Sequence, residues 1–205
     1  MRNPRLKRIK KRKPETAWFL LFAAVTVLLG VGAFVSEQND SRMEPGYAAV
    51  RSPNYNSRPF FTGVDCVVLH ATVTETADDA IRIFLDRRSG VSAHFVVARD
   101  GAVTQMVPLG KRAWHAGKSR LGRRENVNDF SVGIEIVNRN DGKQPYTDRQ
   151  YEAVAGIVRH LRTARKYRIA PGQIVSHRAV AVPEGRKSDP RGFDFSRLRR
   201  LLAEE

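Results

Sequence analysis

Short apolar runs alternate with amphipathic segments over most of the chain, and this alternation is the strongest limit on the folds open to it. The run GVDCVVLHAT, residues 63–72, predicts a buried strand that ends at His70. TADDAIRIFLDRRSG, residues 76–90, predicts a short helix. VSAHFVVARDGAVTQMVP, residues 91–108, predicts a β-hairpin that turns at its Asp-Gly pair.

The remainder of the chain continues this pattern. SVGIEIVN, residues 131–138, predicts a strand, and residues 147–167 predict a long amphipathic helix that opens with a capping box. QIVSH predicts a short strand that ends at His177, and residues 193–205 predict a closing helix. We therefore expect an α/β fold in residues 60–205, a single domain with a central mixed sheet flanked by helices.

The N-terminal region has a different composition. Residues 1–16 carry eight Lys or Arg and one Glu, and residues 17–35 contain no charged residue. Nineteen uncharged, mostly apolar residues are long enough for a transmembrane helix, at about 1.5 Å rise per residue. A basic tail can also bind nucleic acid, but cations next to an apolar run fit the positive-inside rule better. We therefore expect no nucleic-acid partner, and we expect residues 1–16 in the cytoplasm.

The apolar segment could act as a signal anchor or as a signal peptide. Val31-Gly32-Ala33 resembles a cleavage site, whereas the long basic region favours an uncleaved anchor. We predict an anchor that binds the membrane, followed by a linker over residues 36–59. The domain would then lie outside the cytoplasm, in the periplasm or cell-wall space, and would be secreted if the segment is cleaved.

The charge of the chain indicates what kind of partner it can bind, and its cysteine content limits how the fold can be stabilised. After the basic head is set aside, 28 Lys and Arg remain against 20 acidic residues, which suits an anionic partner such as cell wall or phospholipid headgroups. Cys66 is the only cysteine, so the chain cannot form an internal disulfide. Cys66 lies four strand residues from His70, about 13 Å, which is too far for the two to share a metal ion.

A possible metal site is indicated by two histidines and an aspartate. His70 and His177 each end a predicted strand, and Asp189 follows in the loop RKSDP. Ligands gather at strand ends in sheets of this kind, and two histidines with one carboxylate can hold a catalytic zinc ion. Each residue also has a simpler interpretation, because a histidine at a strand end is often hydrogen-bonded and an aspartate before proline is often a turn residue.

Glu135 and Lys187 could supply the remaining chemistry. Glu135 is flanked by isoleucines in a predicted strand, where a carboxylate is costly unless it is paired or belongs to a site. A carboxylate beside a metal-activated water can take up a proton during amide hydrolysis. Lys187 lies two residues before Asp189 and could stabilise an oxyanion. An exposed edge strand is the alternative interpretation of Glu135.

Six stretches between about Asp65 and Phe195 resemble a known family: VVLHAT, VSAHFVVARDGAVTQMV, RAWHAG, SVGIEIVN, IVSHRAV and RKSDP. They are similar to the zinc-dependent N-acetylmuramoyl-L-alanine amidases, a family that includes phage-type amidase lysozymes and peptidoglycan recognition proteins. The resemblance implies a mixed sheet of five or six strands. It also implies hydrolysis of the amide bond between the lactyl group of N-acetylmuramic acid and L-alanine, in peptidoglycan or muropeptides.

The resemblance assigns roles to individual positions. It implies one zinc ion (Zn2+) as cofactor, held by His70, His177 and Asp189. Glu135 would be the catalytic carboxylate, and Lys187 would stabilise the transition state. The alternative is a non-catalytic peptidoglycan-binding or sensing module of the same fold, whose mark would be a lost zinc ligand.

Two positions depart from the family pattern. Some branches have a catalytic tyrosine before the histidine of the hairpin, where this chain has Ala93, so the acid-base role would rest on Glu135. Arg191 intervenes between Pro190 and Gly192 where the family usually has Asp-Pro-Gly, which concerns the shape of the loop.

Three further residues are candidates for substrate binding. Trp114 and His115 in RAWHAG could face a saccharide or stem peptide, with local packing as the alternative. His94 could lie beside the substrate or in the core. His160, in the predicted long helix, is expected on the solvated surface.

Overall fold

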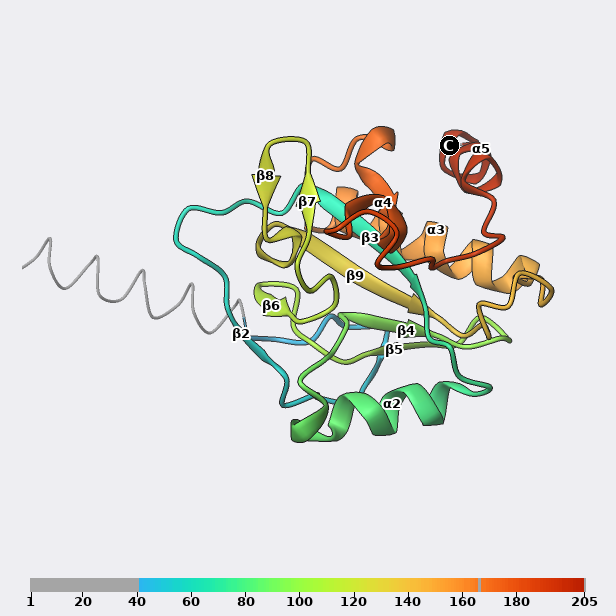
Figure 1. Ribbon diagram of the computed structural model, residues 1–205, viewed down its shortest axis with the longest axis horizontal. Helices are drawn as coiled ribbons and strands as arrows, with labels where there is room; N and C mark the ends of the chain where they lie inside the picture. Colours follow the sequence, from blue (N-terminus) through green and yellow to red (C-terminus); the bar gives the residue numbers. More distant parts are fainter. Residues whose placement is uncertain (1–40, 166, 205) are drawn as a thin grey trace, which may run out of the picture. The chain divides into compact units, whose positions relative to one another are not determined.

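A six-stranded mixed sheet forms the centre of the folded unit, in the order β1-β5-β4-β9-β3-β10 (Figure 1). The computed structural model describes residues 41–165 and 167–204, and all statements about the structure refer to these residues. The strands of this sheet are β1 (Ala48–Ala49), β3 (Cys66–Ala71), β4 (Phe95–Val97), β5 (Val103–Gln105), β9 (Ser131–Ile136) and β10 (Ile174–Ser176). Smaller pairs are made by β2 (Tyr55–Ser57) with β6 (Lys111–Ala113), and by β7 (Arg120–Leu121) with β8 (Arg124–Glu125).

The register of the central strands positions the site. β3 and β9 are parallel, and His70 pairs with Glu135 across them. β4 is parallel to β9 and antiparallel to β5, as the predicted hairpin requires. Because side chains alternate along a strand, His70 and Glu135 project from the same face of the sheet. The side chains next to them in sequence point to the opposite face, where the main core lies.

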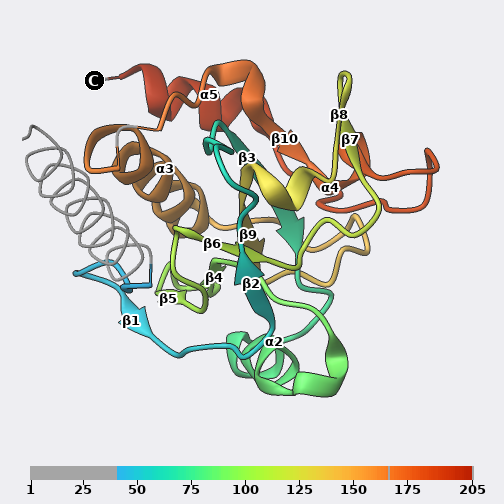
Figure 2. The same ribbon diagram turned by 90° about the vertical axis from the view of Figure 1, so that its left-hand side faces the viewer.

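Helices cover both faces of the sheet. α3 (Asp148–Thr163) and α5 (Phe195–Ala203) share the main core with alternate residues of β3 and β9. α2 (Ala77–Leu85) packs with β4 in a second cluster on the side of the sheet away from α3 (Figures 1 and 2). Short helical segments are η1 (Arg87–Ser89), η2 (Val127–Asp129), η3 (Pro171–Gln173) and α4 (His177–Val180). The predicted mixed sheet flanked by helices is confirmed.

Capping explains where two of the predicted helices, α3 and α2, begin. Thr147 accepts a hydrogen bond from the backbone N–H of Gln150, and the Gln150 side chain accepts one from the N–H of Thr147, which completes the predicted capping box. Thr76 caps α2 by accepting from the N–H of Asp79. α2 ends earlier than predicted, because Asp86 leaves the helix and its side chain caps the short segment η1 instead.

The linker predicted over residues 36–59 is wrong for its described part. Residues 41–59 contribute β1 to the edge of the main sheet and β2 to a second pair. Its polar residues look solvated in the sequence, but several are buried. The Ser52 hydroxyl donates to the carbonyl of Phe84 (2.6 Å), and the Asn54 amide donates to Asp86 and Val91 carbonyls (2.9 and 3.0 Å). These bonds satisfy polar groups in the fold, which a composition argument does not detect.

The strand predicted to end at His177 stops one residue earlier. β10 ends at Ser176, whose side chain accepts from the N–H of Ala179 and so caps α4. His177 is therefore the first residue of a helix. No helix within residues 41–204 is long and apolar enough to cross a membrane. The predicted transmembrane segment, residues 17–35, lies outside the described residues.

Candidate metal centre and catalytic site

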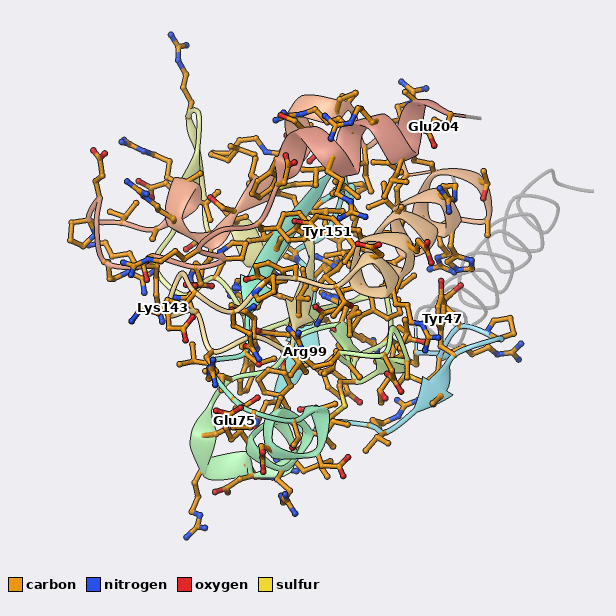
Figure 3. The ribbon with its side chains drawn as sticks, turned by 90° about the vertical axis from the view of Figure 1, so that its right-hand side faces the viewer. Tyr47, Glu75, Arg99, Lys143, Tyr151 and Glu204 are labelled. Carbon is orange, nitrogen blue, oxygen red and sulfur yellow. The ribbon has the colours of Figure 1, made fainter. Side chains whose placement is uncertain are left out.

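The site lies at the C-terminal ends of β3 and β9, where three separate segments meet. His70 comes from β3, His177 from the start of α4, and Asp189 from the loop between α4 and α5. Their ligand atoms all lie within 4.8 Å of one another, and all three residues are buried. Figure 3 views the molecule from this side, with Glu75 and Lys143 labelled on the loops that follow β3 and β9.

The hydrogen bonds of His177 fix its tautomer. Its Nε2 lies 3.2 Å from the carbonyl oxygen of Ala116, and a carbonyl can only accept, so Nε2 carries the proton. The lone pair is then on Nδ1, which lies 3.1 Å from Oδ2 of Asp189.

A second chain of hydrogen bonds fixes His70. The Ser131 hydroxyl donates to the carbonyl of Val127 (2.6 Å), so it accepts from Nε2 of His115 (3.2 Å). Nδ1 of His115 is therefore an acceptor, and it receives the Nε2–H of His70 (3.1 Å). The lone pair of His70 lies on Nδ1, 3.3 Å from Oδ2 of Asp189.

Three electron-pair donors thus converge on one point. Two imidazole Nδ1 atoms and a carboxylate oxygen lie close together with no proton to share between them. A cation satisfies all three, and two His nitrogens with one Asp oxygen are a donor set that zinc favours. Burial lowers the pKa of His70 to about 4, which keeps the ring neutral at pH 7. The predicted ligand residues are brought together, and they fit zinc.

Gly133 makes room for His115. A Cβ atom at Gly133 would lie 2.5 Å from Cγ of His115, which no neighbouring group could tolerate. The ring of His115 therefore rests directly on the backbone of β9, below His70. A glycine in the middle of an otherwise apolar strand is explained by this close approach.

Glu135 lies beside the metal centre. One of its carboxylate oxygens, Oε2, is buried and has no hydrogen-bond partner among the described residues. Burial, with a smaller contribution from the negative charge of Asp189, raises the pKa of Glu135 to about 8, and the nearby cation of Lys187 opposes the rise. An unpaired buried carboxylate next to three converging ligands suits proton transfer.

Tyr146 is a core residue that the sequence reasoning did not single out, and it interacts electrostatically with the two carboxylates of the site. It is buried, and its hydroxyl has no hydrogen-bond partner among the described residues. Burial raises its pKa, as do the charges of Asp189, Tyr151 and Glu135. Its sequence context, immediately before the capping Thr147, gives no signal of a position near the carboxylates.

The departure at Arg191 is accommodated by the loop after β9. The backbone N–H of Arg191 donates to the Asn140 side-chain oxygen (2.7 Å), and the Asn140 amide donates to Oγ of Ser188 (3.1 Å). The aliphatic part of Arg191 packs over Gly142. Asn140 therefore connects the loop that carries Lys187 and Asp189 to the end of β9. The ligand position of Asp189 is kept despite the changed loop sequence.

Two of the three substrate-binding predictions are not supported by the positions of the side chains. His94 is fully buried, its Nδ1 accepts from the N–H of Gly133 (3.0 Å), and its Nε2 donates to the carbonyl of Lys111 (3.0 Å). Burial, then the charge of Arg58, lowers the pKa of His94 to about 3. His94 is a core residue out of reach of a substrate.

His115 is likewise buried, with both ring nitrogens bonded to His70 and Ser131. Its ring contacts His70, and its predicted contact with a saccharide or peptide stays a prediction. Trp114 is partly exposed and donates its indole N–H to Asn56 (3.0 Å), and its substrate role stays a prediction. His160 is mostly buried and paired with Glu44 (2.8 Å), contrary to the expected solvated position.

Three converging ligand side chains beside a carboxylate, on an α/β sheet, form a site of the kind that hydrolases use. The residue pattern of the N-acetylmuramoyl-L-alanine amidase family matches residues 60–192. The chain is 37% identical over 172 residues to the 1,6-anhydro-N-acetylmuramyl-L-alanine amidase AmpD of Salmonella typhimurium, covering 75% of this chain and 89% of AmpD.

Solved structures agree with this relationship. A crystal structure of AmpD superposes with a TM-score of 0.67 at 32% identity, covering 80% of this chain and 98% of the other. AmiD from E. coli, solved with anhydro-N-acetylmuramic acid-L-Ala-D-gamma-Glu-L-Lys, gives a TM-score of 0.60 at 25% identity, covering 78% of this chain and 60% of the other. The chain belongs to the N-acetylmuramoyl-L-alanine amidase family and is an enzyme.

Proposed function

We propose that the protein is a zinc-dependent amidase that cleaves the bond between the lactyl group of N-acetylmuramic acid and L-alanine in muropeptides or peptidoglycan. The observation that carries this proposal is the convergence of the His70, His177 and Asp189 lone pairs beside the unpaired Oε2 of Glu135. AmpD and AmiD, which the chain resembles, are named as amidases of this bond, and AmiD was solved with such a substrate.

The ligand residues would hold the ion, and when bound it supplies Lewis-acid polarisation of the scissile carbonyl and of a water molecule. Glu135 takes a proton from the attacking water at its unpaired carboxylate oxygen. The water oxygen bonds to the carbonyl carbon, the C–N bond then breaks, and Glu135 returns the proton to the leaving nitrogen.

Lys187 has the position for an electrostatic role. It is exposed at the rim of the site, and its charge acts on both Glu135 and His70. A cation there stabilises the negative charge that develops on the carbonyl oxygen in the transition state. Asn140 holds the loop on which Lys187 and Asp189 lie.

The location outside the cytoplasm is proposed from the sequence alone. Residues 17–35 are long and uncharged and follow a basic head, which supports an N-terminal membrane anchor. The domain would then meet its substrate in the periplasm or cell-wall space.

A muropeptide assay tests the activity. The purified protein is incubated with an anhydro-muropeptide, with a reducing-end muropeptide and with intact sacculi, and the products are identified by mass spectrometry. We expect free stem peptide that begins with L-alanine, lost with a chelator and regained with zinc. Glu135→Ala should bind zinc in a metal assay and release no peptide. Zinc binding without peptide release from any of the three substrates would instead support the non-catalytic binding module.

A further inference from the structure

We propose that the surface at the N-terminal ends of β3 and β9 contacts an anionic lipid bilayer, through the side chains of Phe60 and Phe61 and the arginines of the β7–β8 hairpin. The aromatic tip, Phe60 and Phe61, precedes β3 and so lies at the end of that strand opposite His70. The basic hairpin, β7–β8, is joined to this end through the Arg124–Asp65 pair, and its Arg120 lies next to α4. The inference goes beyond the proposed function, because it concerns which face of the domain meets the membrane.

The aromatic tip is almost fully exposed. Phe60 is 89% and Phe61 is 99% accessible to solvent, and the two rings contact each other edge to face, with centroids 5.2 Å apart. Phe61 has a φ of 61°, a left-handed conformation that is unusual for a bulky residue. Two adjacent exposed phenylalanines leave a large apolar area in water, which commonly marks an interaction site.

The base of the tip is held firmly. The Arg58 guanidinium donates to the carbonyls of Asn128 (3.0 Å), Asp129 (2.9 Å) and Ser131 (2.9 Å), at the start of β9. The chain enters the tip from β2 and leaves it into β3, so both sides are tied to strands. The rings are therefore presented on a rigid support, which lowers the entropy lost on binding.

The basic hairpin lies next to this support. Arg120, Arg123 and Arg124 are exposed on it. Arg124 pairs with Asp65 (2.7 Å), at the end of the tip segment, and its guanidinium stacks over the ring of Phe130. Aromatic side chains beside arginines are the combination that binds the interface of an anionic bilayer, because the rings enter the headgroup region and the cations attract the lipid charge.

The attachment point of the domain supports a bilayer as the occupant. Five residues, 36–40, separate the uncharged run from the described domain, a reach of at most about 18 Å. The carbonyl of Ser41 accepts from Arg51 (3.0 Å), and Arg51 donates to the hydroxyl of Tyr55 (3.5 Å), the first residue of the strand that leads to the tip. Arg51 thus connects the start of the described domain to the strand that leads to the tip. Docking by this edge leaves the metal centre, at the other end of β3, facing away from the lipid.

Vesicle co-sedimentation of residues 41–205 tests the proposal. The segment can be studied alone, because the solved AmpD structure matches 80% of this chain over 98% of its own length, so a domain of this extent folds as a unit. Liposomes containing phosphatidylglycerol are compared with pure phosphatidylcholine. We expect binding to the anionic vesicles, weakened about tenfold in Phe60→Ser/Phe61→Ser and in Arg120→Gln/Arg123→Gln.

The matched control is Ile83→Ser/Leu85→Ser, which removes two exposed apolar residues from α2, 44% and 42% accessible. It should bind vesicles as the unaltered domain does. Muropeptide hydrolysis by all variants shows that the metal centre is intact, and it separates failure of this proposal from failure of the proposed function. Absence of vesicle binding, or equal binding by the phenylalanine variant, would overturn the proposal. So would a concentration-dependent dimer, seen by sedimentation velocity, that only the phenylalanine substitutions abolish.

Discussion

Nε2 of His70 lies 3.1 Å from Nδ1 of His115, so the proposed metal ligand His70 donates its outer N–H to a second imidazole whose two nitrogens are both bonded. Outer hydrogen bonds of this kind hold a ligating histidine in one tautomer and one orientation. Here the acceptor is itself fixed by Ser131, whose hydroxyl is committed to the carbonyl of Val127. The orientation of the ligand therefore depends on residues that never touch the metal.

Replacing His115 should weaken zinc binding. In His115→Phe the Nε2–H of His70 loses its acceptor, and the ring is free to turn or to change tautomer. We expect zinc affinity to fall about 10- to 100-fold, measured by competition with a chromogenic chelator. The neighbouring Trp114→Phe should bind zinc normally, because its side chain bonds to Asn56 instead. Unchanged affinity in His115→Phe would show that His70 needs no outer partner.

Gly133→Ala should destabilise the protein through the same ring. The new methyl group would overlap His115, so β9 or the ring must move, at a cost of about 1–3 kcal/mol of unfolding free energy. Urea unfolding measures the change, together with a loss of zinc affinity. Gly156→Ala is the matched control, since a Cβ there meets nothing within 4 Å in α3 and should stabilise the helix by up to about 1 kcal/mol. Equal effects of the two substitutions would refute the steric explanation.

The stability of the metal-free protein should fall between pH 6.5 and 8. The unfolded chain releases the Glu135 proton near pH 4.5, whereas the folded chain keeps it to about pH 8. The folded state therefore binds the extra proton in this window, and raising the pH favours unfolding by up to about 1.4 kcal/mol per pH unit. Burial lowers the pKa values of three histidines from 6.5, so their titration changes the stability only at pH values below this window: His70, His94 and His115.

Chelator-treated protein unfolded in urea at several pH values gives this slope. Glu135→Gln should remove it, and Glu152→Gln on the exposed side of α3 should keep it. A slope that persists in Glu135→Gln would assign the proton to another group.

Asn140→Gly should loosen the loop that carries Lys187 and Asp189. Asn140 has a φ of 58°, so glycine keeps the backbone conformation and removes only the two side-chain bonds, to Ser188 and Arg191. We expect zinc affinity and kcat both to fall by about three- to tenfold, the effect of one or two exposed hydrogen bonds. The control is Gly122→Asn in the distant β7–β8 turn, where the backbone also has a positive φ of 59°. This substitution should leave zinc affinity and kcat unchanged. Normal zinc affinity in Asn140→Gly would mean that the loop holds its shape alone.

The sequence predicted the strands of His70 and Glu135, because continuous apolar runs are a strong signal for buried strands. The capping box of Thr147 and Gln150 likewise marked the start of α3 correctly. The ligand set followed from residue types and from a family resemblance. The metal itself stays a proposal, supported by the convergence of three lone pairs.

Other features depended on long-range contacts. Ser52 and Asn54 are buried because backbone carbonyls around α2 accept their hydrogens, and nothing near them in the sequence indicates those partners. His94 looked like a site residue by type, but its position on the same face as Gly133 places it in the core under Arg58. Polar residues in short segments are therefore ambiguous until their partners are known.

Because His70 pairs with Glu135 across β3 and β9, the enzymatic activity can be lost through an error in strand register alone. A slip of β9 by a single residue would turn the carboxylate into the apolar layer beneath α3 and α5 and bring a branched hydrocarbon chain to the ligands. The register of the two strands therefore sets the distance between the Glu135 carboxylate and the proposed ligand His70. The surrounding loops can change, and with them the substrate preference, without altering this register. A folding intermediate with a shifted sheet would keep its secondary structure but would have no amidase activity. Turnover would then report correct strand pairing more sensitively than a spectroscopic measure of helix or sheet content.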